Sequence, residues 1–199
     1  MVTESSSRPL RADAQRNHDR IVAAAYAAFA ESGLDTSVEE IARRAGVGSA
    51  TLYRRFPNQD LLLRAIIDAR LAELEPRIAA AVAAEDPWEG LLAAFQAVLD
   101  IQARNMAFLR VLVEAGALPH LKGELADRVF APIYALFERA QRAGKVRDDL
   151  APSEIHALIR MVAATAHGEG CTADGGWPRY LGLLGDALRT PQPTELPPR

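Results

Sequence analysis

The chain has 199 residues, of which 49% are hydrophobic and 25% are charged, and its formal net charge is −3. This length suits two small domains or one large helical domain, and no apolar run approaches the roughly 20 residues that a membrane-spanning helix needs. The N-terminus lacks the apolar region of a signal peptide and the single Cys171 excludes an internal disulfide, so we expect a soluble cytoplasmic protein.

The first part of the chain predicts a short arm followed by a helix. Residues 1–11 are polar and rich in serine, and we expect them to be disordered. Their arginines, with Arg16, form either a basic arm or a solvated tail. From residue 12 to Ser32 the apolar positions have helical spacing, and Gly33 offers a stop for that helix.

A helix, a turn and a second helix are predicted between Thr36 and Asp60. Ser37 can cap the first helix with Glu40 in the reciprocal arrangement that satisfies two backbone N–H groups. The apolar face of this helix consists of Val38, Ile41, Ala42 and Ala45. Gly46 can end it in the left-handed conformation.

The second short helix runs from Ser49 to Phe56 and is stopped by Pro57. It buries Leu52 and Phe56 and leaves hydroxyl, aromatic and guanidinium groups on its other faces. This is the build of a helix-turn-helix whose second helix enters the DNA major groove. Residues 41–59 hold four arginines and no acid, so the positive field is local to this helix and its flanks.

The rest of the chain is predicted to be helical. Asn58 can cap a fourth helix, in which Pro76 should produce a kink or a short break. Five further helices are expected, one from Pro87 and the others at about residues 105–115, 122–143, 152–167 and 177–189. Pro132 should bend the third of these, and residues 190–199 form a proline-rich, disordered tail.

Most of residues 18–63 resembles the TetR family of one-component transcriptional regulators. The segments that carry the resemblance are Ile21–Ala25, Phe29–Gly33, Val38–Ala42, Ala45–Val47, Thr51–Pro57 and Leu61–Leu62. The resemblance implies an all-α homodimer of about nine helices per chain. Residues 12–57 would be a three-helix DNA-binding domain, and residues 58–189 a ligand-binding and dimerisation domain that begins with a linking helix at 58–85. Its implied partners are double-stranded DNA with a palindromic operator and a small-molecule effector, with no cofactor and no membrane.

The resemblance also assigns residues to the DNA face. The candidates are Thr36, Ser37, Arg44, Gly48, Ser49, Ala50, Thr51, Tyr53, Arg54 and Arg55. Thr51 and Tyr53 match phosphate-contacting positions, and Thr51 is also a candidate for a thymine methyl. Arg54 is the candidate for a bidentate guanine contact. Arg44 and Arg55 either contact DNA or are solvated.

Two positions depart from the family pattern. Gly48 stands where a capping serine is common, which weakens the start of the second helix by a few tenths of a kcal/mol. Gln59 stands where many members carry a basic residue, which removes one phosphate contact and predicts a shallower salt dependence.

An effector pocket is expected between the helices that follow residue 86, mostly apolar with a few polar groups. The candidate residues are Phe95, Leu99, Gln102, Met106, Leu109, Leu112, Tyr134, Phe137, His156, Met161 and Thr165. Each is alternatively an ordinary core residue, since aromatic residues and methionine at helical spacing usually pack in the core. The identity of the ligand cannot be read from these residues.

A two-fold operator requires a two-fold protein. In the family the last two long helices pair with those of the second subunit, and by resemblance these are residues 152–167 and 177–189. The candidate interface residues are Ile159, Val162, Ala163, Trp177, Tyr180, Leu181, Leu184 and Leu188.

Enzymatic functions are not expected. The four histidines, at 18, 120, 156 and 167, have no metal-ligand spacing, and no phosphate-binding glycine motif is present. Cys171 is either a redox sensor or an ordinary thiol. We therefore predict a DNA-binding repressor released by a small apolar or amphipathic ligand. The alternative is an all-α small-molecule binding or scaffolding protein that no longer binds DNA specifically.

Overall fold

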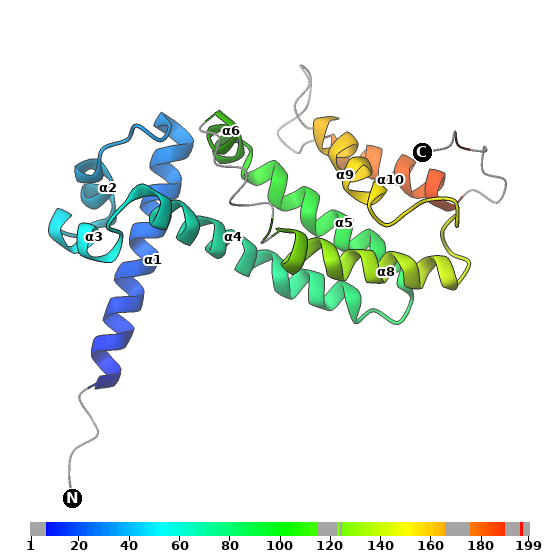
Figure 1. Ribbon diagram of the computed structural model, residues 1–199, viewed down its shortest axis with the longest axis horizontal. Coiled ribbons are helices and arrows are strands. Elements are labelled where there is room, and N and C mark those ends of the chain that lie inside the picture. Colours follow the sequence, from blue (N-terminus) through cyan, green and yellow to red (C-terminus); the bar gives the residue numbers. More distant parts are fainter. Residues whose placement is uncertain (1–6, 115–122, 124, 166–175, 190–195, 197–199) are drawn as a thin grey trace, which may run out of the picture. The chain divides into compact units, whose positions relative to one another are not determined.

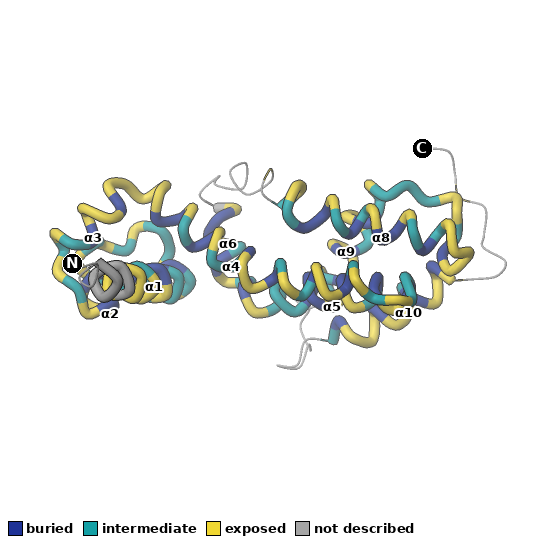
Figure 2. Tube along the Cα trace, turned by 90° about the horizontal axis from the view of Figure 1, so that it is seen from below, coloured by how far each residue is buried: buried dark blue, intermediate teal, exposed yellow. Residues whose placement is uncertain are grey.

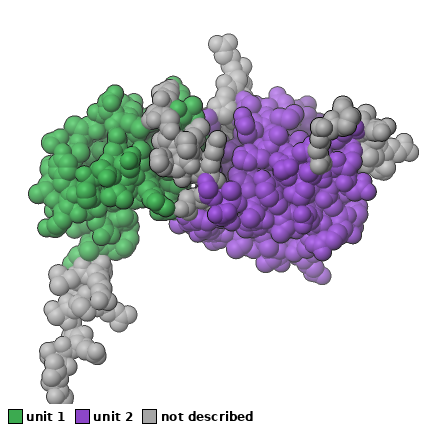
Figure 3. Space-filling view, in the orientation of Figure 1, with its two compact units in different colours: residues 1–70, 107–120 green, residues 71–106, 121–199 purple. Residues whose placement is uncertain are grey.

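The computed structural model describes residues 7–114, 123, 125–165, 176–189 and 196. The regular secondary structure of these residues is helical throughout, with nine α-helices, one π-helical turn and no strand (Figure 1). The predicted all-α fold is therefore confirmed. Two compact units divide the chain, residues 1–70 with 107–120 and residues 71–106 with 121–199 (Figure 3).

Unit 1 contains the predicted helix-turn-helix. It comprises α1 (Ser7–Ser32), α2 (Val38–Ala45), α3 (Ser49–Arg55), the start of α4 (Gln59–Val82) and nearly all of α6 (Met106–Glu114). The side chains buried in its core include Ile21, Val22, Ala25, Phe29, Ile41, Ala42, Leu52, Phe56, Leu62 and Ile66. Figure 2 shows buried positions alternating with exposed ones along α2 and α3, as expected for short amphipathic helices.

α1 begins at Ser7, earlier than the predicted start at residue 12. Pro9 lies in the first turn, where its missing N–H interrupts no intrahelical hydrogen bond, so a proline there does not prevent the helix. Residues 7–11 are thus helical rather than a disordered arm, and residues 1–6 lie outside the described part of the chain.

Ser37 and Gly46 bound α2 as predicted. The Oγ of Ser37 accepts a hydrogen bond from the Glu40 N–H at 3.2 Å, and Gly46 has φ +66°. The reciprocal half of the predicted cap is different, because the Glu40 carboxylate turns to the guanidinium groups of Arg43 and Arg44.

The two boundaries of α3 also follow the sequence. Gly48 precedes α3 without a side-chain cap, and Phe56 follows its last turn. Asn58 then caps α4, since its Oδ1 accepts from the Leu61 N–H at 2.9 Å.

Unit 2 contains the rest of α4, α5 (Pro87–Arg104), η1 (Ala126–Phe130), α8 (Ala131–Arg142), α9 (Glu154–Ala164) and α10 (Trp177–Arg189). Asp86 caps α5 as predicted, with its Oδ1 2.8 Å from the Trp88 N–H. The core includes Leu74, Ile78, Leu91, Phe95, Leu99, Ile133, Phe137, Ile155, Ile159 and Leu188.

Prolines account for three differences from the predicted elements. α4 continues through Pro76 without a break. The predicted helix at 122–143 is instead a π-helical turn followed by α8, whose first turn holds Pro132. The π-helical turn ends at Phe130, two residues before Pro132, which has no N–H to donate. α9 begins at Glu154, two residues after Pro152.

Candidate nucleic-acid interface

α3 has one buried side, and the residues on its other sides are half-buried or exposed. Leu52 and Phe56 lie in the core of unit 1, whereas Ala50, Tyr53 and Arg54 are exposed. At 100° per residue, Ala50 and Arg54 lie opposite the buried side, which makes them the outermost positions. Ser49 and Tyr53 flank them on one side, and Thr51 and Arg55 on the other. The predicted reading face is therefore present on the surface.

The four arginines of residues 41–59 have different surroundings. Arg43 contacts the Glu40 carboxylate at 2.7 Å, and Arg44 contacts Glu40 at 2.7 Å and Glu31 at 2.6 Å. Hydrogen bonds from Arg44 and then Arg43 lower the pKa of the Glu40 carboxyl. The charges of Arg43 and Arg44 are thus locally compensated, which weakens the case for Arg44 as a DNA contact.

Arg54 and Arg55 make no ion pair with any carboxylate in the described part of the chain. Arg55 instead contacts a histidine. Its Nε donates a hydrogen bond to Nδ1 of His18 at 3.3 Å, and this acceptor nitrogen carries no negative charge. Uncompensated positive charge therefore gathers at the C-terminal end of α3.

His18 connects α1 to α3 and was not among the predicted site residues. Its ring lies against Phe56 with centroids 5.3 Å apart, beside the hydrogen bond from Arg55. Partial burial and then the charge of Arg55 lower the pKa of His18, while Asp19 opposes them. The neutral imidazole that results is the form that can accept from Arg55. No local motif marks His18, since its contacts are with residues 37 and 38 positions further along the chain.

The two DNA-face candidates before α2, Thr36 and Ser37, differ from each other. The Thr36 hydroxyl donates to the Gly33 carbonyl at 2.8 Å, so its donor already fixes the turn. Ser37 is exposed and its Oγ serves as a cap acceptor, which leaves its hydroxyl hydrogen for a phosphate. Gln59 donates to the Leu34 carbonyl at 2.5 Å and so ties α4 to the same turn.

The pocket candidates lie in both units. Leu109 and Leu112 belong to unit 1, and the other nine belong to unit 2. Phe95, Leu99, Phe137 and Leu112 are buried, and Gln102, Met106, Leu109, Tyr134 and Thr165 are half-buried. His156 and Met161 are exposed, with His156 stacked on Phe130 at 4.2 Å. In a single chain these two side chains do not line an internal cavity.

The dimer candidates require a correction. Ile159, Val162, Trp177, Leu181 and Leu188 are buried within their own chain, so they do not present a surface to a partner. Ala163 and Leu184 are half-buried, and Tyr180 is 42% exposed. The other large apolar side chains exposed on α9 and α10 are Met161 and Leu183, at 66% and 58%. The helical spacing identified an apolar face, but it could not show whether that face packs against the same chain or against a second copy.

The described residues contain no group of three or more histidine, cysteine, aspartate or glutamate side chains placed to hold a metal ion. In the same residues, no helix is both long and apolar enough to cross a membrane. Cys171 and the glycine-rich segment around it lie outside the described part of the chain.

Known proteins share both the helix-turn-helix and the whole-chain fold. Residues 21–66 match the family described as bacterial regulatory proteins, tetR family. The structure of a TetR transcriptional regulator from Streptomyces coelicolor is 31% identical, over 89% of this chain and 99% of that one, with a TM-score of 0.64. A TetR transcription regulatory protein from Mycobacterium vanbaalenii is 33% identical, over 92% and 100%, also with a TM-score of 0.64. The HTH-type transcriptional regulator SrpR of Pseudomonas putida is 26% identical over 145 residues, which is 70% of this chain and 68% of that protein.

Proposed function

The chain belongs to the TetR family of DNA-binding transcriptional regulators, and from this premise we propose that it is a homodimeric repressor of a palindromic operator. A small apolar or amphipathic ligand would release it. In the DNA-bound conformation, the two copies of α3 would lie about 34 Å apart and enter successive major grooves. The ligand would favour another conformation only to the extent that it binds the two conformations unequally.

The observation that carries the DNA-binding part is the exposure of Arg54 on α3 without a carboxylate partner among the described residues. A guanidinium that is paired with a carboxylate side chain would have to break that ion pair before it could bind a DNA base. An uncompensated one is free to form a bidentate contact with guanine, worth about 1–3 kcal/mol of discrimination.

The direct test is selection of DNA from a random pool, followed by fluorescence anisotropy with the recovered sequence. We expect a palindromic motif bound at least ~10³-fold more tightly than bulk DNA. Arg54→Ala should weaken binding to this motif and relax the preference at one base pair of each half-site. Arg43→Ala is the matched control, because it also removes one exposed arginine, but one whose charge Glu40 already compensates.

Two results would reject this proposal. If no motif is recovered and residual binding only fades with salt, the chain is better described as an all-α small-molecule binding or scaffolding protein. If Arg43→Ala and Arg54→Ala weaken binding equally at all sequences, the arginines act through general charge and α3 does not read bases in the way proposed.

Support for the homodimer comes from α9 and α10, which pack against each other in unit 2. They expose Met161, Tyr180 and Leu183. Large apolar side chains that gather on the surface of neighbouring helices are typical of an interaction surface. A second copy of the chain is the occupant that a palindromic operator requires.

Support for a ligand comes from Gln102 on α5. Its Oε1 is buried and has no hydrogen-bond partner among the described residues. Leu99 and Phe95 are buried one and two turns earlier on the same helix. Leaving a buried amide oxygen unsatisfied costs about 1–3 kcal/mol, which a ligand hydroxyl or amide would recover. This combination fits an amphipathic ligand with one hydrogen-bond donor.

Thermal unfolding tests the ligand part. Primary alcohols of increasing chain length should raise the melting temperature and lower the affinity for the operator. Matched alkanes should have less effect, and Gln102→Leu should abolish the difference between the two series. If no compound changes either quantity, the protein is a repressor without a ligand of this class.

A further inference from the structure

The N-terminal half of α1 extends past the helices that cover its other half. α1 has 26 residues and spans about 39 Å at 1.5 Å per residue, whereas α2 has 8 residues and α3 has 7. Between residues 13 and 32 of α1 the buried positions begin at Ile21, and residues 13–16 are exposed. Figure 1 shows this half of α1 running beyond α3. A cleft lies between the two helices where they diverge.

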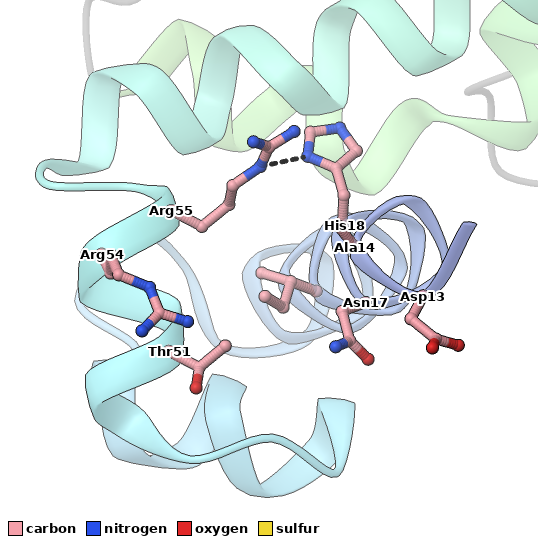
Figure 4. A pocket seen from close by; sticks show the side chains of 8 residues that line it. Asp13, Ala14, Asn17, His18, Thr51, Arg54 and Arg55 are labelled. Carbon is pink, nitrogen blue, oxygen red and sulfur yellow. Dashed lines mark hydrogen bonds between the residues drawn. The ribbon is translucent and has the colours of Figure 1, made fainter. Parts of the chain in front are cut away.

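The cleft is open to solvent and has a volume of about 400 Å³. Its lining residues are Asp13, Ala14, Asn17, His18 and Ile21 of α1 and Thr51, Arg54 and Arg55 of α3. Figure 4 shows Thr51 and Arg54 across the opening from Asn17, and Arg55 reaching back to His18. The two guanidinium groups, the hydroxyl and the amide of this lining suit a charged group that accepts hydrogen bonds.

Hydrogen-bond donors predominate in this cleft. The guanidinium groups of Arg54 and Arg55 are present without a carboxylate partner among the described residues, and Thr51 adds a hydroxyl. The Oδ1 of Asn17 accepts from Arg20 at 2.6 Å, which leaves the NH₂ group of Asn17 to donate. The one carboxylate of the lining, that of Asp13, is bound by Arg16.

We propose that this cleft holds a phosphate of the DNA backbone, next to the bases that α3 reads, so that α1 is a second DNA-contacting element. Asn17 would donate to the phosphate from α1, and Thr51 and Arg55 would donate from α3. His18 holds the Arg55 side chain on the cleft side of α3 and is a positioning residue. This inference rests on the proposed DNA-binding function and adds a contact outside the helix-turn-helix.

DNA is a better occupant than a free phosphate ion because the cleft adjoins the outermost positions of α3. Arg54 lines the cleft and also lies opposite the buried side of the helix, so a strand that passes the reading face would pass the cleft opening. A protein that neutralises DNA phosphates binds with a salt dependence that grows by about 0.9 in log–log slope per phosphate contact. Loss of the contact is therefore measurable separately from loss of base reading.

The test compares two charge changes on the same helix, Asn17→Asp and Gln15→Glu, in the full-length protein with the selected operator. Both add one negative charge to α1, but Gln15 does not line the cleft and contacts Asp19 instead. We expect Asn17→Asp to weaken binding about tenfold and to reduce the salt slope by about 0.9 for each half-site. Gln15→Glu should change the affinity less than threefold, and Asn17→Ala should give an intermediate loss with unchanged thermal stability.

Operators with one neutral methylphosphonate at a time locate the contact. For the wild type, neutralising one position in each half-site should weaken binding about tenfold, and the same change should have no further effect on Asn17→Asp. The cleft does not hold a backbone phosphate if the losses of affinity from Asn17→Asp and from the methylphosphonate add up at every operator position. The same conclusion follows if Asn17→Asp and Gln15→Glu bind the operator equally well. Failure of the proposed function is a different result, since the wild type would then select no operator at all.

Inorganic phosphate tests whether the cleft binds a free phosphate ion instead of a phosphate of the DNA backbone. At constant ionic strength it should neither stabilise the wild type more than Asn17→Asp nor compete with the operator. If phosphate raises the melting temperature of the wild type alone, while Asn17→Asp binds the operator normally, the cleft is a site for a free anion and the DNA assignment is overturned.

Discussion

The Nε of Arg55 donates a hydrogen bond to Nδ1 of His18, 3.3 Å away, and so joins the C-terminal end of α3 to α1. His18 also lies against Phe56, the residue that follows α3. The reading helix is only 7 residues long and has no side-chain cap at its start. A helix so short is marginal by itself, so its orientation depends on contacts of this kind.

The contact predicts a stability that falls in mild acid. The pKa of His18 is lowered in the folded chain, and so is the pKa of His156, through partial desolvation of its ring and then the charge of Arg160. Above the ordinary value of 6.5 both histidines are neutral in the folded and the unfolded state. As the pH falls through that value, the unfolded state binds protons first, so the free energy of unfolding decreases until the folded-state pKa is passed.

Urea denaturation at pH 7.5 and 5.5 measures this change, in a range where most carboxylates stay ionised. His18→Gln keeps a neutral acceptor for Arg55 and should remove part of the pH dependence. His156→Gln should remove a separate part, since the two histidines lie in different units. An unchanged pH dependence in both variants would show that neither histidine is responsible.

Arg139→Ala should destabilise unit 2 by about 3 kcal/mol. The guanidinium donates to the carbonyls of Val82 at 2.9 Å and Ala84 at 2.7 Å, and so satisfies acceptors at the end of α4. Hydrogen bonds that involve a charged group contribute about 1.5–3 kcal/mol each, and the two bonds of one side chain are not fully additive. Chemical denaturation checks the value. Arg142→Ala, on the same helix but exposed, should cost less than about 0.5 kcal/mol.

Gly90→Ala should destabilise the protein by about 1–3 kcal/mol, because α5 passes the end of α4 closely at this position. A Cβ at Gly90 would lie 2.4 Å from the Ala81 carbonyl oxygen, a backbone atom that cannot move away alone. Gly185→Ala is the matched control, since its Cβ would meet Trp88 at an ordinary 3.5 Å. That change should be neutral or stabilise by up to about 1 kcal/mol. Equal losses in thermal unfolding would contradict the proposed cause.

Met161→Glu and Leu183→Glu should each shift the protein from dimer to monomer, with a dissociation constant raised at least about 100-fold. Both side chains are more than half exposed in the single chain, so the change does not disturb its own core. Sedimentation velocity gives the mass in solution. Val113→Glu, which changes an equally exposed side chain on α6, should leave the dimer intact. Monomerisation by Val113→Glu alone would place the interface elsewhere.

The helix-turn-helix was predictable because its signals are local. Ser37, Gly46 and Asn58 act on backbone groups within a few residues, and the caps that these three residues form are present in the structure. Helical spacing likewise identified apolar faces, since it reflects the geometry of one helix. The effect of Pro76 was predicted less well, because α4 continues through this residue without a break.

The prediction from sequence and the structure differ most in the positive charge around the helix-turn-helix. Residues 41–59 contain four arginines and no acid, yet Glu40 and Glu31 lie just outside that range and compensate Arg43 and Arg44. The contact with Glu31 joins residues 13 positions apart and depends on how α1 packs against α2. Counting charges in a segment therefore overestimated the positive field and did not show where it is concentrated.

The sequence by itself determined the all-α fold, the helix-turn-helix and which residues of α3 face outward, because these depend on interactions within one helix or one turn. Only the tertiary structure decided which apolar residues of α9 and α10 face their own core and which face outward. It alone brought His18 and Asn17 beside Arg54 and Arg55. The physical reason is the same in both cases. Contacts between distant residues depend on how helices pack, and a periodic pattern fixes the face of a helix but not the neighbour that covers it.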